Sequence, residues 1–207
     1  MPRQIALSRL VKATLDGIKH AETAHEKWSD GWTLSHTAEH VLYGFIANSI
    51  MNLPGKKSVE IEPRCRDIIR ESCGNRKGRL PRAIRPDGHI DMVVCWGSGK
   101  PRAVIEIKNN VYNYNGQCES DIKRIAGMLQ KTNVSLRFGM FAFFCSADTG
   151  KNKTAKEKLE HRFNSIKSRI SGYCEPNIRV TGDYRVVEYD DSAYLCACIV
   201  MQPLKAH

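Results

Sequence analysis

The chain has 207 residues, of which 42% are hydrophobic and 26% are charged, a balance that is ordinary for a globular protein. It contains no apolar run as long as a membrane span, and its first residues lack the apolar core of a signal peptide, so we expect a cytoplasmic protein with no membrane partner. Its 32 Lys and Arg residues outnumber 22 Asp and Glu residues, and the net charge of +10 favours a polyanionic partner such as nucleic acid.

One domain is expected over residues 1–207, with an N-terminal helical arm at 1–31 and a core at 32–207. Eight cysteines are dispersed along the chain without a Cys-x-x-Cys pair. A chain of this length can bury a core without covalent cross-links. The scattered positions of the cysteines therefore predict reduced thiols rather than disulfides or a zinc site.

Two helices are predicted near the N-terminus from apolar residues at helical spacing, the first over 2–27 and the second from a cap at Thr33 or Ser35 to about residue 54. Glu39 is the only Asp, Glu, Lys or Arg between residues 32 and 53. A lone carboxylate beside an apolar face needs a partner or a metal ion, because burying an unpaired charge is costly. Glu39 is therefore a candidate site residue, and a side chain that leans out to solvent is the alternative.

The same stretch matches His-x-x-Glu-His at His36, Glu39 and His40, a pattern that places two histidines one helical turn apart beside an acid, as zinc peptidases require. The match covers five residues, and the third ligand that such enzymes take from a later helix has no evident counterpart. A zinc peptidase is therefore the less favoured hypothesis. The simpler hypothesis is that the two histidines lie on a helix surface or contact a phosphate.

A basic loop is predicted at residues 74–85, after a short edge strand at 58–62 and a short helix at 63–72. Glycine and proline interrupt the loop, and its cations are suited to neutralising backbone phosphates of a nucleic acid. The residues assigned to this role are Arg76, Lys77, Arg79, Arg82 and Arg85.

A β-hairpin is predicted at residues 93–107, where two apolar runs flank Gly97-Ser98-Gly99-Lys100. A turn centred on residues 98 and 99 pairs Trp96 with Pro101, and counting outward pairs Asp91 with Glu106. Directly opposed residues share one side of a sheet, so two carboxylates meet there.

Lys108 lies two residues beyond Glu106 and is expected on the same side of the sheet. Opposed carboxylates repel, so the arrangement calls for a cation between them, and a divalent metal ion held by oxygen ligands is suited to that place. A surface hairpin with a cross-strand ion pair is the alternative. A second (D/E)-x-K triplet begins at Asp121 in a predicted helix, where residues i and i+2 face different ways, so Asp121, Lys123 and Arg124 are assigned to surface pairing.

The hairpin resembles the catalytic core of the PD-(D/E)XK nuclease superfamily, in which an Asp begins one strand and (D/E)-x-K ends the next. Here the matching residues are Asp91 and Glu106-Ile107-Lys108, and the family's Pro-Asp is present as Pro86-Asp87. Either Asp87 or Asp91 can be the first acid. Asp91 is favoured because an apolar strand follows it at once and because it falls opposite Glu106.

The resemblance implies a three-layer restriction-endonuclease-like α/β core with a central mixed sheet flanked by helices. It implies hydrolysis of phosphodiester bonds that depends on Mg²⁺, with Mn²⁺ as a substitute, and DNA as a substrate ahead of RNA. Asp91, Glu106 and the main-chain carbonyl of Ile107 would hold the metal, Lys108 would orient and help to deprotonate water, and Glu39 would assist. A DNA endonuclease of restriction, defence or DNA processing is the expected function. A homodimer is left open, and a non-catalytic nucleic-acid-binding module on this fold is the alternative.

The rest of the chain is predicted to complete one α/β layer structure. In the polar segment 109–116, Tyr112 and Tyr114 are candidates for stacking on bases, with an ordinary Asn/Gly turn as the alternative. Periodicity predicts helices at 117–131 and 154–170, the second with a basic outer face. A nearly continuous apolar run at 136–145 predicts a strand at the sheet centre, and two further strands are expected at 178–189 and 194–202.

Overall fold

The computed structural model describes residues 5–73, 80, 82–131, 135–174 and 176–204. Three of the predicted phosphate-binding residues, Arg76, Lys77 and Arg79, lie outside the described residues.

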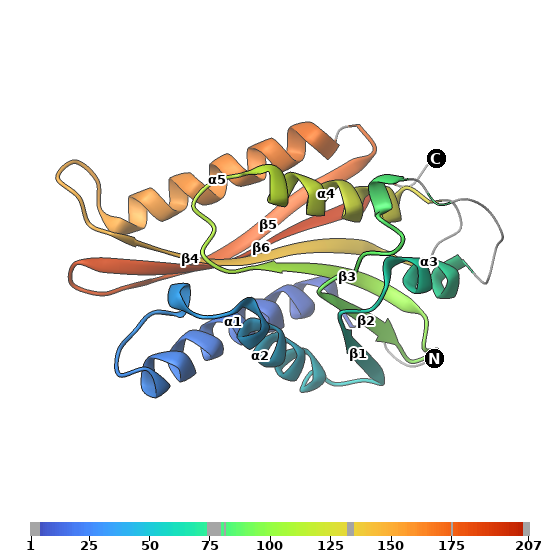
Figure 1. Ribbon diagram of the computed structural model, residues 1–207, viewed down its shortest axis with the longest axis horizontal. Helices are drawn as coiled ribbons and strands as arrows, with labels where there is room; N and C mark the ends of the chain where they lie inside the picture. The colour runs from blue at the N-terminus through green and yellow to red at the C-terminus, as the bar shows by residue number, and fades with distance from the viewer. Residues whose placement is uncertain (1–4, 74–79, 81, 132–134, 175, 205–207) are drawn as a thin grey trace.

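A mixed sheet of six strands forms the centre of the molecule, in the order β1-β2-β3-β4-β6-β5 (Figure 1). Only β3 and β4 run parallel, and α4 connects them. The sheet confirms the predicted α/β class, the edge position of the first strand and the central position of the apolar run. The strands are β1 Lys57–Ile61, β2 Met92–Trp96, β3 Pro101–Lys108, β4 Phe138–Asp148, β5 Ile178–Glu188 and β6 Ser192–Pro203.

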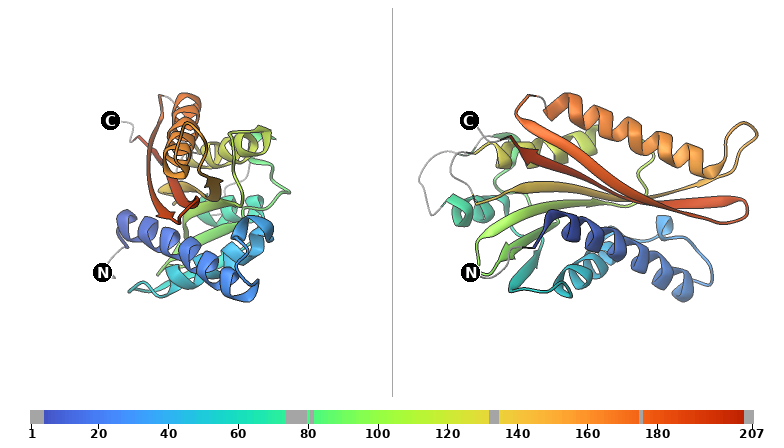
Figure 2. Two further views of the ribbon diagram at one scale, coloured as in Figure 1. Left: turned by 90° about the vertical axis from the view of Figure 1, so that its left-hand side faces the viewer. Right: turned by 180° about the vertical axis from the view of Figure 1, so that it is seen from behind.

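Helices cover both faces of this sheet, and an end-on view shows the sheet between two helical layers (Figure 2). One layer holds α1 and α2, and the other holds α4 and α5 (Figure 1). No helix of the described ranges combines the length and the apolar character needed to cross a membrane. The helices are α1 Leu7–Trp28, α2 Glu39–Met51, α3 Cys65–Cys73, α4 Gly116–Leu129 and α5 Ala155–Cys174, with 3₁₀ turns η1 at Leu34–His36 and η2 at Arg82–Ile84.

The alternation of side chains along the strands divides the core into two apolar clusters, one on each face. In β2, Val93 contributes to the cluster under α4 and α5, whereas Met92 and Val94 contribute to the cluster under α1 and α2. Helix α1 supplies fully buried residues such as Leu10 and Ile18 to the second cluster. The N-terminal helix is therefore part of the core and not an arm.

The second helix begins at Glu39, later than the predicted caps at Thr33 and Ser35, and its first turn has no side-chain cap. The segment before it forms η1, because groups distant in sequence hold its backbone. The buried carboxylate of Glu22 accepts a hydrogen bond from Leu34 N at 2.7 Å, and Asn109 Nδ2 donates to Leu34 O at 2.7 Å and to Thr37 O at 2.9 Å.

The hairpin register agrees with the prediction in the half away from the turn, where Met92 pairs with Ile105. The predicted pairing of Trp96 with Pro101 is wrong, because the register shifts at Val94 and Cys95 so that Cys95 faces Pro101. A bulge of this kind adds one residue to one strand next to the turn and leaves the pairing farther along unchanged.

The crossing of α1 and α2 requires a glycine. A Cβ at Gly17 would lie 2.6 Å from Ile46 Cα and 2.9 Å from Ile46 N, which are backbone atoms that cannot rotate away. By contrast, a Cβ at Gly44, in the middle of α2, meets nothing within 4 Å.

We therefore expect Gly17→Ala to lower the free energy of unfolding by about 1–3 kcal/mol through overpacking. Gly44→Ala is the matched control, and it should raise that free energy by about 0.5–1 kcal/mol because alanine loses less backbone entropy in a helix. Urea unfolding followed by circular dichroism measures both changes. Equal stability of Gly17→Ala and the wild type would contradict the observed helix crossing.

Candidate functional site

The sheet has a gap beside the end of β3, because β2 is the shorter strand. β2 begins at Met92, opposite Ile105, so Glu106, Ile107 and Lys108 extend past it. Ile107 N, which has no β2 residue to pair with, donates to Asp91 Oδ2 at 2.6 Å. The N–H and C=O of one strand residue point to the same side, so the carbonyl of Ile107 also faces this gap.

Four acidic side chains meet at this gap, and we refer to Glu39, Asp91, Glu106 and Asp121 as the carboxylate cluster. Glu39 is the first residue of α2, Asp91 precedes β2, Glu106 lies in β3 and Asp121 lies in α4. Lys108 Nζ lies among them, 3.3 Å from Glu39 Oε2, 3.5 Å from Asp121 Oδ2 and 4.0 Å from Asp91 Oδ2. Both helical layers, β3 and the segment before β2 therefore contribute to one polar centre.

A second cation, Arg124, binds the deeper half of the cluster. Its Nη2 donates to Asp121 Oδ1 at 2.7 Å, and its Nη1 lies 2.9 Å from Glu106 Oε1 and also donates to the carbonyl of His89. Glu106 is 1% exposed and Arg124 is 8% exposed, so water screens this pair weakly.

The assignment of Asp121 and Arg124 to surface pairing was wrong, because both side chains are buried at the carboxylate cluster. Residues three or four apart on a helix share a face. Asp121 lies three residues after Cys118 and four before Ile125, both buried, and Arg124 lies three residues after Asp121. The sequence signal that could have predicted their burial is the presence of two opposite charges on the apolar face of a predicted helix. The expected surface position does hold for Lys123, which pairs with Glu119.

Burial shifts the acids of the cluster toward their protonated forms. Desolvation, followed by the charges of Asp91 and Asp121, raises the pKa of Glu106 well above its usual range despite the opposing charge of Arg124. Burial also raises the pKa of Glu39 and of Asp121, although Lys108 partly offsets both shifts.

Lys108 has the opposite balance. Burial by itself would lower its pKa, but the four surrounding carboxylates outweigh burial and raise the pKa of Lys108 above its ordinary value. Without a metal ion among these carboxylates, Lys108 is therefore a protonated cation at neutral pH.

The residues of the cluster fit a divalent cation. Four carboxylates face two cationic side chains, so the fully ionised cluster carries two more negative than positive charges. Among the described residues, Glu106 Oε1 and Asp121 Oδ2 are buried oxygens that accept no hydrogen bond and are held by ion pairs with Arg124 and Lys108. The described ranges contain no three His, Cys, Asp or Glu side chains already grouped as a metal site. Two carboxylates and the Ile107 carbonyl, with water and phosphate completing the shell, are a donor set that Mg²⁺ accepts.

The contacts of the two candidate first acids differ. Asp91 contacts Ile107 N and Lys108 Nζ, whereas Asp87 pairs with Arg66 and its side chain is 84% exposed. Only Asp91 joins the residues of the (D/E)-x-K triplet.

The histidines of the His-x-x-Glu-His pattern do not share a helix. His36 ends η1 and packs against the ring of Trp32, while Thr37 and Ala38 are extended before α2 begins. His40 contacts Glu62 instead. The arrangement of two ligands one helical turn apart, on which the zinc interpretation depended, is absent from this segment.

The described residues with predicted nucleic-acid contacts lie on the side of α4 and α5. Arg82 and Arg85 are exposed, and Arg85 Nη1 donates to Ser120 Oγ at 3.2 Å, one residue from Asp121. Tyr112 is exposed, and Tyr114 is half-buried in the segment that leads from Lys108 to α4.

Comparisons of the chain with protein-family models, with curated proteins and with solved structures found no match.

The raised pKa of Glu106 predicts how stability depends on pH in the presence of a chelator. The folded state holds the Glu106 proton more tightly than the unfolded state, so this stabilisation is complete below the ordinary glutamate pKa of about 4.3 and is lost as pH rises through the raised value. We expect the melting temperature of the wild type to fall more steeply than that of Glu106→Gln between about pH 5 and about pH 8. Glu119→Gln, on an exposed face of α4, is the matched control.

Adding Mg²⁺ at neutral pH should raise the melting temperature of the wild type and of Glu119→Gln, but not that of Glu106→Gln. A ligand at 100 times its Kd stabilises by about 2.7 kcal/mol, and each kcal/mol is about 2–4 °C in a domain of this size. Equal Mg²⁺-induced shifts in all three proteins would show that Glu106 holds no metal.

Proposed function

We propose that this chain is a metal-dependent nuclease with a restriction-endonuclease-like core, which hydrolyses phosphodiester bonds of nucleic acid. The observation that carries this proposal is the convergence of Asp91, Glu106 and Lys108 at the gap beside β3. This convergence follows the strand register on which the resemblance to PD-(D/E)XK nucleases rests.

The proposed division of roles follows from burial and charge. Asp91, Glu106 and the carbonyl of Ile107 hold a divalent cation, which when bound would supply the positive charge that activates water and neutralises the phosphate. Arg124 and Asp121 fix the position of Glu106 from α4. Lys108 stays protonated, so it orients water and the scissile phosphate by donating hydrogen bonds.

Glu39 is the proposed proton acceptor. Its side chain is 37% exposed, against 15% for Asp91 and 9% for Asp121, so water reaches it most easily. Burial raises the pKa of Glu39 towards neutrality, which makes its carboxylate a better base. Lys108 Nζ, 3.3 Å away, holds the Glu39 carboxylate in place.

DNA is the proposed substrate ahead of RNA, with restriction, defence or DNA processing as the biological setting, and both extend the resemblance to PD-(D/E)XK nucleases. The net charge of +10 and the exposed Arg82 and Arg85 support a nucleic-acid partner. A non-catalytic nucleic-acid-binding module is the second candidate. The direct ion pairs of Lys108 and Arg124 with the cluster favour this second candidate, because they partly neutralise the carboxylate charges without a metal ion.

Cleavage should require Mg²⁺ or Mn²⁺ and should be lost in Asp91→Asn. Removing a metal-holding charge costs several kcal/mol in the transition state, which is more than about 10³-fold in rate. The matched control is Asp87→Asn, which removes an exposed acid from the same segment and should cleave normally. Supercoiled plasmid, linear duplex, single-stranded DNA and RNA are incubated in Mg²⁺, Mn²⁺ or EDTA.

Undiminished cleavage by folded Asp91→Asn would refute the nuclease assignment at this site. Tight binding of nucleic acid by the wild type, with no cleavage of any substrate, would favour the non-catalytic module.

Glu39→Gln should lower kcat by about 10²-fold or more, because a general base contributes about that much. The wild-type rate should rise with pH through the raised pKa of Glu39, and the variant should lose this rising limb. His36→Ala, three residues earlier, should leave both rate and pH profile intact. Stoichiometric zinc in the purified protein that is lost in His36→Ala would instead revive the peptidase hypothesis.

A further inference from the structure

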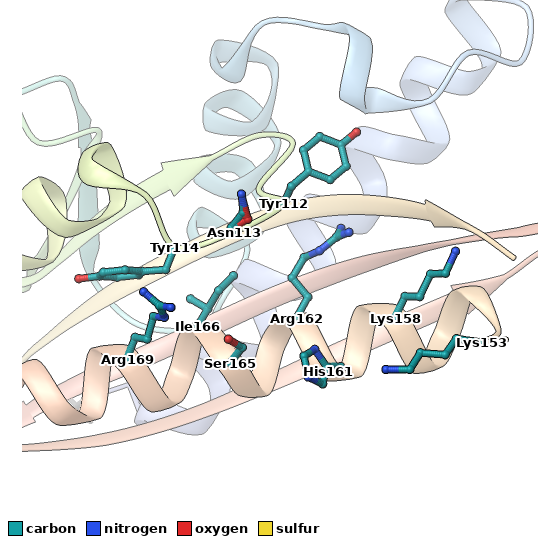
Figure 3. A pocket seen from close by; sticks show the side chains of 10 residues that line it. All are labelled: Tyr112, Asn113, Tyr114, Lys153, Lys158, His161, Arg162, Ser165, Ile166 and Arg169. Carbon is teal, nitrogen blue, oxygen red and sulfur yellow. The ribbon is translucent and has the colours of Figure 1, made fainter. Parts of the chain in front are cut away.

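A second concave site lies between the segment after Lys108 and the outer face of α5 (Figure 3). It has a volume of about 360 Å³ and shares no residue with the carboxylate cluster. We refer to it as the α5 groove. The lining residues that bear on its chemistry are Tyr112, Tyr114, Lys153, Lys158, Arg162 and Arg169.

The α5 groove is positively charged, with four Lys or Arg side chains and no Asp or Glu in its lining. Lys158 Nζ donates to Asp148 O at 2.9 Å and Arg162 Nη1 donates to Ser146 O at 3.1 Å, and these carbonyl partners leave both charges unneutralised. The acids of α5 are engaged elsewhere, since Glu157 caps the helix at Thr154 and Glu160 accepts from Tyr184. The groove therefore attracts anions.

An aromatic ring lies at one side of the groove with a face open to solvent. The guanidinium carbon of Arg162 lies 4.9 Å from the ring centroid of Tyr112, yet Tyr112 remains 53% exposed. The cation lies over one face of the ring, and the exposed part of the ring leaves surface on which a planar ligand can stack. A nucleobase on such a ring would be stacked above an Arg–Tyr pair.

The length of the groove suits a strand of more than one nucleotide, and its exposed ring favours an unpaired base. Lys158 and Arg169 are eleven residues apart on one face of α5, which is about 16 Å and longer than one nucleotide. A paired base hides its faces in the helical stack, whereas an unpaired base can stack on tyrosine.

We propose that the α5 groove binds an unpaired stretch of a nucleic-acid strand, with its phosphates along the basic face of α5 and a base on Tyr112. The groove and the carboxylate cluster are joined by the short segment between Lys108 and α4. On this proposal the unpaired stretch leads towards the scissile phosphate, and this last step rests on the proposed nuclease function. The substrate class is then a nucleic acid with a single-stranded flank, such as an overhang or a flap.

The test measures binding in EDTA, where cleavage does not interfere. Labelled single-stranded DNA, single-stranded RNA and blunt duplex DNA of one sequence are titrated with full-length protein across a salt series. The variants are Tyr112→Ala, Tyr112→Phe and the double variant Lys153→Gln with Arg169→Gln. Lys156→Gln is the matched control, because it removes a charge from α5 outside the groove, where Lys156 pairs with Glu188.

We expect Tyr112→Ala to bind single strands about 5- to 150-fold more weakly, which is the range for loss of one stacked base. Tyr112→Phe keeps the ring and should bind normally. The double variant should lower the slope of log affinity against log salt by about 0.7 for each phosphate that it no longer neutralises, and Lys156→Gln should not. Duplex binding should change little in Tyr112→Ala. The comparison of the DNA and RNA arms identifies which strand the groove prefers.

The proposal is overturned if the wild type binds single strands no more tightly than duplex, or if the groove variants lose no more affinity than Lys156→Gln. Failure of the nuclease function has a different signature. In that case the groove variants lose single-strand binding as expected, while wild type in Mg²⁺ leaves flapped, overhanging and blunt substrates intact.

Discussion

The early end of β2 is the constraint on which the candidate site depends. Because β2 begins opposite Ile105, three residues of β3 continue without a β2 neighbour, and the Asp91 carboxylate accepts a hydrogen bond from Ile107 N, which no strand residue satisfies. The hydrogen bond from Ile107 N to Asp91 thus replaces the missing strand pairing and places the Asp91 carboxylate beside Glu106. A strand longer by two residues would fill the gap with main chain, and the acids from the two helical layers would have no place to meet.

The gap also explains how helices on opposite faces of the sheet contribute to one centre. Lys108 contacts Glu39 of α2 on one side and Asp121 of α4 on the other. Asn109, the next residue, binds the backbone of Leu34 and Thr37 in the turn before α2. The end of β3 therefore fixes the position of Glu39 through its neighbour as well as through the lysine.

The electrostatic design of this centre costs stability in the absence of a further cation. Burial raises the pKa of Glu106, Glu39 and Asp121, which means that the ionised form of each acid is less stable here than in water. Two cations oppose four acids, and a buried oxygen of Glu106 is held by its ion pair with Arg124 and by no hydrogen bond among the described residues. Such strain is common at functional sites and is not needed for a stable core. The basic α5 groove, by contrast, has an excess of positive charge, so the two sites together suit a ligand that carries phosphates.

The amino-acid sequence by itself determined the α/β class, the central apolar strand, the edge strand and the register that sets Met92 opposite Ile105, because strand period and turn length are local properties. It also singled out Glu39 through the absence of other charges nearby. Only the tertiary structure decided that α2 begins at Glu39, since Glu22 and Asn109 hold the preceding turn from afar. Likewise, Asp121 and Arg124 join the site because α4 packs its apolar face, with those charges, over the end of β3. Periodicity identifies the face of a helix that turns inward, but the packing of that helix on the sheet decides what lies beneath it.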